Sequence, residues 1–316
     1  MLKILVAGGA GFIGSHLCKK LIEEGNTVYC VDNLITGSKD NVVSLLDNPK
    51  FNYFERDVTK PLIEIPEVNQ VYHLASPASP NKKSERSYIN FPIETLLANS
   101  VGTYNLLTLA KERNARFLFA STSEVYGDPK VTPQVETYFG NVNPNGVRSV
   151  YDEGKRFGEA MTFGFLRKYG VDARIVRIFN TYGPFMQKDD GRVVSAFINQ
   201  AITNAPITIF GDGKQTRSFC YVDDMVEGLM QMMNTDAARG EVINLGNTDE
   251  RTIAAIADVV KSMTASNSEI TFEELPEDDP HVRKPDVTKA KTILGWESKI
   301  SLEEGIRKTI EYFRNA

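Results

Sequence analysis

The chain has 316 residues, of which 41% are hydrophobic, so its length and composition allow a buried core in one large or two modest domains. A formal net charge of -5 provides no basic surface for nucleic acid, and we expect no nucleic-acid partner. No apolar run reaches the roughly 20 residues that span a bilayer, and the first predicted strand leaves no room for a signal peptide. We therefore expect a soluble, cytoplasmic protein without membrane contact. The cysteines and histidines lack the spacing of metal ligands, so we expect no metal site: Cys18, Cys30, Cys220, His16, His73 and His281.

Short β-branched runs alternate with longer helical patterns through the first half of the chain. The sequence predicts strands over residues 3–6, 27–31, 52–54, 70–74, 116–120 and 173–177, and helices over residues 12–24, 92–112 and 151–169. This alternation is typical of an α/β fold of Rossmann type, with a doubly wound parallel sheet between layers of helices. Beyond Asn180 the predicted elements become shorter. We expect residues 181–316 to form a smaller lobe, with a soft boundary across which segments can interleave.

A glycine-rich turn follows the first predicted strand. Gly8, Gly11 and Gly14 open the first helix, where residues without a Cβ let a pyrophosphate approach the helix N-terminus. Asp32 ends the second predicted strand about 20 residues downstream, where this fingerprint places an acid for the ribose 2′-hydroxyl. Because the same carboxylate repels a 2′-phosphate, the pattern predicts NAD rather than NADP as the cofactor.

Other residues are predicted to line the same cofactor site from neighbouring strand ends and loops. They are Phe12, Ile13, Asn33, Gly37, Asp57, Val58, Leu74 and Ser76, together with Tyr151 and Lys155. Asp57 and Val58 follow the third predicted strand, where they could flank the adenine. An ordinary acid at a strand end explains Asp57 nearly as well.

Tyr151 and Lys155 form a candidate proton-transfer pair. They are four residues apart and share one face of a predicted helix. A lysine ammonium and a bound nicotinamide cation would bring the pKa of the tyrosine toward neutrality, so that it could act as a general base. Thr122, at the end of a predicted strand, could hydrogen-bond the same substrate hydroxyl. Such a pair alone is commonly a solvated helix face, but its occurrence with Thr122 and the glycine turn favours catalysis.

Several longer stretches of the sequence match one family. They are residues 73–80 (His-Leu-Ala-Ser-Pro-Ala-Ser-Pro), 121–129, 151–156, 177–184, 190–195 and 215–219. On these stretches the chain resembles, nearly end to end, the extended short-chain dehydrogenase/reductases that modify nucleotide sugars, and most closely their UDP-glucuronate decarboxylase (UDP-xylose synthase) branch. The resemblance implies an NAD-binding Rossmann domain over residues 1–180, a substrate-binding lobe over residues 181–316, and a homodimer with a helical interface.

The resemblance also implies roles for individual residues. Thr122, Tyr151 and Lys155 match the catalytic residues of the family, and Ser123 and Glu124 match residues at the reacting sugar. Because guanidinium groups bind phosphate oxygens in bidentate fashion, we expect four residues to hold the nucleotide part of the substrate. These are Asn180, Arg192, Arg217 and Arg283. Any one of the arginines is about as often a surface ion-pair partner.

The implied reaction starts with oxidation of C4 of the sugar by NAD. The 4-ketone makes the C5 carboxylate a β-keto acid that can lose CO2, and Glu124, or a water that it orients, could manage the proton returned to C5. A sugar 4-epimerase and a 4,6-dehydratase are the rival enzymes. The dehydratases normally have Asp where this chain has Ser123, and the epimerases usually lack the acid at position 124. A non-catalytic NAD-sensing protein would be free to lose Tyr151 or Lys155.

Some positions depart from the decarboxylase pattern. Leu97 and Phe185 stand where the pattern has a lysine and an arginine, so two cations are missing. In residues 144–148, Pro-Asn-Gly-Val-Arg replaces Pro-Ile-Gly-Pro-Arg, and the sugar-facing loop is expected to differ. Residues 81–88 are additional to the pattern. Their cations either replace the missing charges or form a solvated surface run: Lys82, Lys83 and Arg86.

Overall fold

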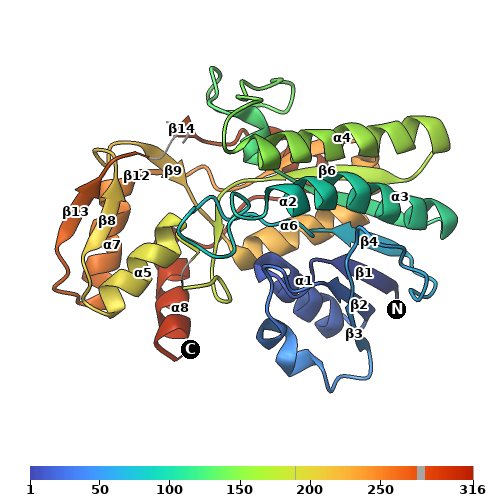
Figure 1. The fold of residues 1–316 in the computed structure, drawn as a ribbon, viewed down its shortest axis with the longest axis horizontal. Coiled ribbons are helices and arrows are strands. Elements are labelled where there is room, and N and C mark those ends of the chain that lie inside the picture. Colours follow the sequence, from blue (N-terminus) through green and yellow to red (C-terminus); the bar gives the residue numbers. More distant parts are fainter. Residues whose placement is uncertain (189, 276–281, 316) are drawn as a thin grey trace.

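A computed structural model describes residues 1–188, 190–275 and 282–315 (Figure 1). Its centre is a seven-stranded parallel sheet with the strand order β11-β6-β5-β4-β1-β2-β3, which confirms the predicted Rossmann-type fold. The strands of this sheet are β1 (Lys3–Ala7), β2 (Thr27–Asp32), β3 (Phe51–Glu55), β4 (Gln70–His73), β5 (Arg116–Thr122), β6 (Ala173–Ile178) and β11 (Val242–Leu245).

The central strands are continuous apolar runs rather than alternating ones. In β1 every residue after Lys3 is buried, and β2 is buried from Val28 to its end. Such runs are typical of parallel strands that are covered on both faces. All strands point the same way, so their carboxyl ends meet at one edge of the sheet, where ligands bind in folds of this type.

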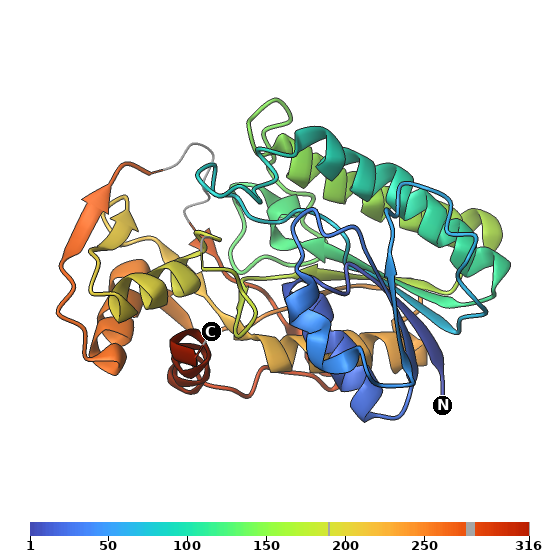
Figure 2. The ribbon, with the colours of Figure 1, turned by 60° about the horizontal axis from the view of Figure 1, so that its bottom comes forward.

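Helices cover both faces of this sheet (Figures 1 and 2). On one face α3 and α4 pack against β4, β5 and β6, and on the other α1 packs against β1 and β2 and α6 against β5 and β6. The α-helices of the described residues are α1 (Phe12–Glu23), α2 (Pro92–Leu97), α3 (Thr103–Glu112), α4 (Ser149–Tyr169), α5 (Val193–Ile202), α6 (Val222–Asn234), α7 (Ile253–Thr264) and α8 (Leu302–Asn315). Shorter helical turns are η1 (Lys39–Leu45), η2 (Ala98–Gly102), η3 (Ser123–Tyr126), η4 (Asp236–Ala238) and η5 (Ala290–Leu294).

The later residues form three small sheets beside the large one. β9 (Thr216–Ser218) pairs with β12 (Glu250–Thr252) and β14 (Val282–Arg283), β7 (Thr181–Tyr182) pairs with β10 (Cys220–Tyr221), and β8 (Ile207–Phe210) pairs with β13 (Ile270–Glu273). The chain does not stay in this part after residue 180, because α6 and β11 return to the large sheet. The division into domains at residue 180 stays a prediction.

Within the described residues, no helix combines the length and the apolar character needed to cross a membrane. The same residues contain no group of three or more His, Cys, Asp and Glu side chains that could hold a metal ion. His16 contacts the carbonyl oxygen of Pro184 through Nε2 at 2.9 Å, and the buried His73 contacts the Thr103 hydroxyl at 3.0 Å. His281 lies outside the described residues.

Candidate active site

The glycine-rich turn between β1 and α1 leaves no space for side chains. Gly8 has a φ of +80°, and a Cβ at this position would lie 2.7 Å from the backbone nitrogen of Ala75. A Cβ on Gly14 would lie 2.0 Å from the carbonyl oxygen of Gly8. Gly11 caps α1 without a side-chain hydrogen bond, so the first amides of the helix can bind an anion.

A pocket follows this turn along the carboxyl ends of β1, β2 and β4. Arg56, Glu94 and Leu97, which the sequence analysis did not assign to the cofactor, also line it. Tyr151 and Lys155 lie outside the lining, as do Phe12, Ile13 and Gly14 of α1. The predicted cofactor residues that this pocket brings together are Gly8, Gly11, Asp32, Asn33, Gly37, Asp57, Val58, Leu74 and Ser76.

Asp32 is fixed at the end of β2 by two backbone amides. Its carboxylate accepts hydrogen bonds from the Ala10 nitrogen at 3.0 Å and from the Leu34 nitrogen at 2.9 Å. Burial raises the pKa of Asp32, and the two hydrogen bonds oppose this rise. The carboxyl group is therefore held rigidly in the wall of the pocket.

Tyr151, Lys155 and Thr122 meet where α4 packs on β5. Tyr151 lies in the first turn of α4 and forms a hydrogen bond with the side chain of Thr122, the last residue of β5. Lys155 follows one helical turn later. Its Nζ donates to the carbonyl oxygen of Ala120 at 2.9 Å and lies 5.7 Å from the centre of the Tyr151 ring.

Burial controls the protonation of this pair. It raises the pKa of Tyr151 to about 12, although the hydrogen bond with Thr122 lowers it, and it lowers the pKa of Lys155 to about 7. For the protein alone, burial therefore keeps the pKa of Tyr151 high. The expectation that Lys155 and a nicotinamide cation together bring this pKa toward neutrality stays a prediction. The predicted lowering also depends on the positive charge of a nicotinamide ring.

Glu124 lies among arginines from three separate parts of the chain. Its carboxylate oxygens are 2.5 Å from Nη2 of Arg148 and 2.6 Å from Nη2 of Arg283, and all three side chains are nearly buried. Burial alone would raise the pKa of Glu124. The positive charges of Arg283, Arg148 and Arg217 outweigh burial and lower this pKa to about 2. Glu124 is thus a carboxylate at neutral pH, within an excess of positive charge.

Arg148 is a site residue that the sequence analysis missed. It caps α4 and lies three residues before Tyr151, so both side chains fall on one face of the helix start. The segment 144–148 was interpreted only as a loop that differs from the family. The spacing between the arginine and the tyrosine was the signal that could have identified it.

Buried polar atoms near Tyr151 have no hydrogen-bond partner among the described residues. These are Oη of Tyr88, Oδ1 of Asp152 and Nδ2 of Asn180. The Tyr88 ring stacks on the Tyr151 ring, with centres 4.9 Å apart and planes at 5°. Oδ1 of Asn180 accepts a hydrogen bond from Nη1 of Arg283 at 3.0 Å. Since buried polar groups are normally paired, these atoms suit a ligand that has many hydroxyls.

The remaining predicted substrate residues divide between two places. Arg192 pairs with Asp190, with its Nε 2.9 Å from both carboxylate oxygens, and its charge lowers the pKa of Tyr151. Arg217 lies in β9 and contributes to the field at Glu124. Asn180, Arg217 and Arg283 therefore gather at Glu124, whereas Arg192 lies near Tyr151.

Residues 4–246 match the model of the "NAD dependent epimerase/dehydratase family". The chain belongs to this family. Its relatives include UDP-glucuronic acid decarboxylase 2 of Arabidopsis thaliana, 53% identical over 99% of this chain and 68% of that protein. UDP-glucuronic acid decarboxylase 1 of Xenopus tropicalis is 50% identical over 99% of this chain and 72% of that protein.

Solved structures of the family share the whole fold. The UDP-glucose 4-epimerase of Thermotoga maritima, solved with UDP-glucose, has a TM-score of 0.90 and 32% identity over 99% of each chain. The UDP-glucuronic acid 4-epimerase of Bacillus cereus, solved with UDP-glucuronic acid and NAD, has a TM-score of 0.89 and 29% identity over 99% of each chain.

The residues of the glycine turn fit the NAD of this family. Any side chain at Gly8 or Gly14 would collide with backbone, so both glycines are needed for the tight turn and for the close packing of α1. Gly11, between them, lines the pocket and lets a pyrophosphate approach the backbone. The Asp32 carboxylate lines the same pocket, where it can accept hydrogen bonds from a ribose diol and would repel a 2′-phosphate. The protein is thus an NAD-dependent member of the family.

The two positions at which the family's cations are missing lie away from the arginines around Glu124. Leu97 lines the cofactor pocket. Phe185 packs its ring 5.2 Å from His16 of α1 and 5.2 Å from Tyr312 of α8. These substitutions therefore leave the positive charge around Glu124 in place.

The additional residues 81–88 form a hydrogen-bonded loop. The Ser87 hydroxyl and the Tyr88 amide both donate to the carbonyl oxygen of Ser79, each at 3.0 Å. The loop thereby holds Tyr88 against Tyr151. Lys83 is 81% exposed and lies 3.7 Å from Glu273, so its charge is solvated rather than directed into the site.

Proposed function

We propose that the protein is an NAD-dependent decarboxylase that converts UDP-glucuronate into UDP-xylose through a 4-keto intermediate. The observation that carries the proposal is the excess of arginine charge around Glu124, beside the Tyr151 and Thr122 pair. This arrangement suits an acidic sugar attached to a diphosphate. Relatives that match 99% of the chain at 50% identity or more are UDP-glucuronic acid decarboxylases, which supports the same substrate.

In the first step Tyr151 accepts the proton of the sugar 4-hydroxyl. NAD, held at the glycine turn, would supply the acceptor for the C4 hydride and would give the hydride back at the end, so it would not be consumed. Thr122 hydrogen-bonds the Tyr151 oxygen and orients it toward the hydroxyl. Lys155, with its Nζ 5.7 Å from the centre of the Tyr151 ring, favours the phenolate in its protonated form.

The ketone at C4 then makes CO2 loss possible. The bond between C5 and the carboxylate breaks, CO2 leaves, and the electron pair moves toward the C4 oxygen to form an enolate. Arg148 and Arg283 hold the negative charge of the substrate and of the enolate. Because Glu124 is ionised at neutral pH, it cannot donate a proton itself. It would orient a water that passes a proton from solvent to C5. Tyr151 then returns its proton to the C4 oxygen as the ketone is reduced, which completes UDP-xylose.

A 4-epimerase is the second candidate, because the solved UDP-glucuronic acid 4-epimerase shares the fold at a TM-score of 0.89. Its identity of 29% is well below the 53% of the decarboxylase. Ser123, which replaces the dehydratase aspartate, argues against a 4,6-dehydratase. The close packing of Tyr151, Lys155 and Thr122 argues against a protein that only senses NAD.

One assay separates these functions. The protein is incubated with UDP-glucuronate without stoichiometric NAD, the sugar nucleotides are separated by liquid chromatography against epimer standards, and CO2 and the separated products are measured by mass spectrometry. We expect CO2 and UDP-xylose in equal amounts. A product of unchanged mass with inverted C4 would instead identify an epimerase, and an inert UDP-glucuronate together with turnover of a neutral nucleotide sugar would reject the acidic substrate.

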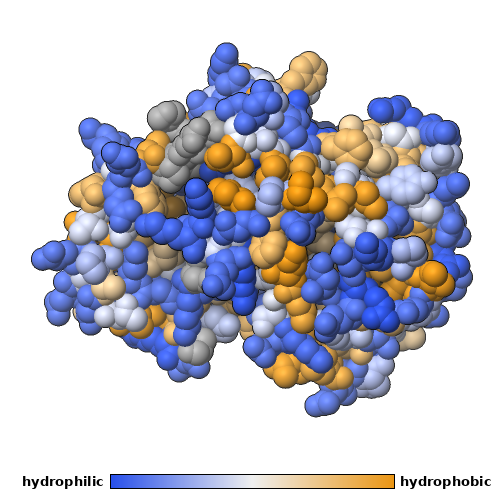
Figure 3. Space-filling model, viewed as in Figure 1, coloured by the Kyte–Doolittle hydropathy of each residue, from blue (hydrophilic) through white to orange (hydrophobic). Residues whose placement is uncertain are grey.

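We also propose that the protein is a homodimer that pairs through α2, η2, α3 and α4. Figure 3 shows apolar side chains gathered over α2 and the adjoining part of α4. Exposed apolar patches of this kind commonly mark interfaces. The large apolar residues exposed on these helices include Ile93, Leu96, Leu97, Val101, Tyr104 and Phe157.

A further inference from the structure

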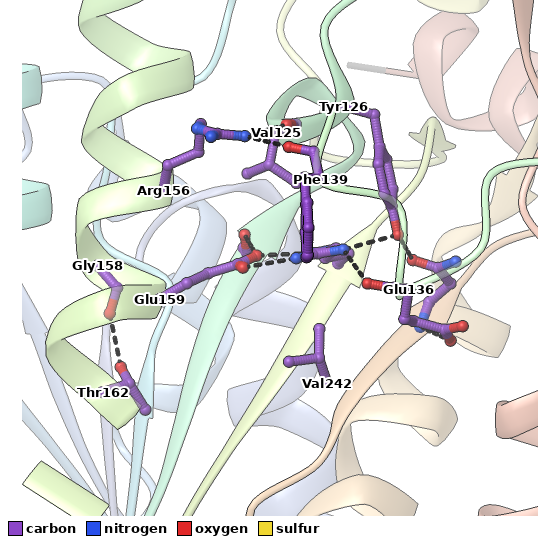
Figure 4. A network of polar contacts seen from close by, with 12 residues as sticks. Val125, Tyr126, Glu136, Phe139, Arg156, Gly158, Glu159, Thr162 and Val242 are labelled. Carbon is purple, nitrogen blue, oxygen red and sulfur yellow. Dashed lines mark hydrogen bonds and ion pairs between the residues drawn. The ribbon is translucent and has the colours of Figure 1, made fainter. Parts of the chain in front are cut away.

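A chain of buried hydrogen bonds begins behind the candidate catalytic residues (Figure 4). The hydroxyl of Ser121, the neighbour of Thr122, donates to Oε1 of Glu159 at 2.6 Å. Glu159 lies four residues beyond Lys155 on the same face of α4. It accepts two further hydrogen bonds from Arg177 of β6, from Nε at 2.8 Å and from Nη2 at 2.7 Å. Glu159 in the middle of α4 thus links the ends of two strands, β5 through Ser121 and β6 through its ion pair with Arg177.

The chain continues through Tyr126, which ends η3 two residues after Glu124. Nη1 of Arg177 donates to the Tyr126 hydroxyl at 2.9 Å, and this hydroxyl donates to Oδ1 of Asn244 in β11 at 2.8 Å. Tyr126 is 1% exposed and Asn244 is fully buried. One hydroxyl therefore uses both its acceptor and its donor capacity to connect two strands.

At its far end the chain reaches the segment that carries Arg283. Nδ2 of Asn244 donates to the carbonyl oxygens of Gln134 at 2.9 Å and of Asp286 at 3.2 Å. Gln134 accepts two further hydrogen bonds from this segment. Its side-chain Oε1 accepts one from the Lys284 amide at 2.7 Å, and its backbone carbonyl oxygen accepts one from the Asp286 amide at 2.9 Å. Because Lys284 follows Arg283 directly, these bonds fix the backbone on which Arg283 reaches Glu124.

We propose that Tyr126 is a positioning residue that holds Arg283 against Glu124 for the decarboxylation step. The inference rests on the proposed function. Removal of the Tyr126 hydroxyl breaks the link between the side chains of Arg177 and Asn244, although their backbones still pair in the sheet. The Asn244 side chain, which binds the 284–286 segment, then loses one of its anchors, while the contact of Tyr151 with Thr122 remains. Steps that depend on Arg283 and Glu124 should therefore slow more than oxidation at C4.

The test compares Tyr126→Phe with Tyr138→Phe. The Tyr138 ring lies almost parallel to the Tyr126 ring, with centres 6.2 Å apart. Its hydroxyl accepts a hydrogen bond from the exposed Lys130 amide at 3.1 Å and takes no part in the chain that leads to residues 284–286. In single turnovers with UDP-glucuronate, we expect Tyr126→Phe to release CO2 about tenfold more slowly, with C4 oxidation, followed by NADH absorbance, within about twofold of the wild type. Tyr138→Phe should behave as the wild type. Equal slowing of both steps, or no slowing, would overturn the proposal.

A second measurement needs no activity. The amides of Lys284 and Asp286 donate to Gln134, so hydrogen exchange of a peptide over residues 282–288 should be faster in Tyr126→Phe than in the wild type or in Tyr138→Phe. If the wild type releases no CO2 from UDP-glucuronate, the proposed function fails, yet exchange still decides whether Tyr126 supports this segment. Unchanged exchange in Tyr126→Phe would overturn the inference.

Discussion

Two carboxyl groups near Tyr151 are held in opposite protonation states. The charges of Arg283, Arg148 and Arg217 outweigh burial and lower the pKa of Glu124 to about 2. Burial, followed by the negative charge of Glu124, raises the pKa of Asp152 to about 8. Two carboxyl groups whose pKa values are separated in this way can take different chemical roles, one as an acid and one as a base. At neutral pH the site thus contains one carboxylate and one carboxylic acid.

Asp152→Asn should change how stability depends on pH. The pKa of Asp152 lies well above its ordinary value of 3.8, so the folded protein binds one more proton than the unfolded chain between pH 4 and pH 8. Wild-type stability from this group is fully present below about pH 4 and is lost as pH rises to about 8. The melting temperature of Asp152→Asn, relative to that of the wild type, should therefore be higher at pH 8.5 than at pH 5. Glu153→Gln, at the partly exposed next position, is the control, and an equal difference at both pH values would contradict the prediction.

Tyr151→Phe should reduce turnover by at least about 1,000-fold, because the variant lacks the group that accepts the C4 proton. NAD binding should persist, since the pocket at the glycine turn does not include Tyr151. Lys155→Met should also reduce turnover, because it removes the charge whose Nζ lies 5.7 Å from the centre of the Tyr151 ring. Turnover assays and direct NAD titrations check these outcomes, and near-normal turnover of Tyr151→Phe would show that another group is the base.

Residue patterns predicted most of the site but not its electrostatics. The pairing of Tyr151 with Lys155 follows from spacing, because positions four apart on a helix share a face. Thr122 was placed there from its position at the end of a predicted strand. Spacing could have placed Arg148 beside Tyr151, but the charge environments of Arg148 and Asp152 could not be derived in this way. Their importance depends on η3, the start of α4 and β14 meeting in space, and β14 lies more than 100 residues from the other two.

At the scale of elements, the catalytic geometry depends on how closely α4 lies on β5. A Cβ at Gly158 would be 2.2 Å from the Cζ atom of Phe119, so the helix touches the strand only because this residue is glycine. Tyr151 and Lys155 extend from the same helix toward Thr122 and Ala120. The position of α4 therefore sets the distances within the site.

Gly158→Ala should destabilise the protein and reduce its activity. Overpacking against Phe119 costs about 1–3 kcal/mol, which exceeds the gain of about 1 kcal/mol that alanine gives a helix. Gly164→Ala in the same helix is the control, because its Cβ would meet no atom within 4 Å and should stabilise the protein by up to about 1 kcal/mol. Urea unfolding and turnover assays test both variants. A stable and fully active Gly158→Ala would show that α4 can shift without consequence.

The order of elements was predictable through residue 178, but the later return to the sheet was not. The predicted helix over residues 92–112 is present, although the π-helical turn η2 separates it into α2 and α3. β11 is only four residues long, and its pairing with β6 is a contact between distant segments that local periodicity does not encode. The short strands after residue 180 likewise depend on pairing with strands that are distant in the sequence.

At the scale of the whole molecule, the apolar face over α2, α3 and α4 should join two copies of the chain. A stable interface buries about 800 Å² on each partner, and a charge placed at its centre is strongly unfavourable. The double variant Ile93→Glu with Tyr104→Glu changes two side chains that are 60% and 51% exposed, so the fold should tolerate it.

Light scattering after size exclusion should give the wild type a mass of two 35.2-kDa chains and the double variant a mass of one. Phe139→Glu is the matched control, because Phe139 is 89% exposed on the loop before α4 and lies outside the helical face. It should remain dimeric. Neither Ile93 nor Tyr104 lines the cofactor pocket, and the double variant should therefore keep its affinity for NAD even as a monomer. A wild type that is monomeric at micromolar concentration, or a double variant that is still dimeric, would reject this face as the interface.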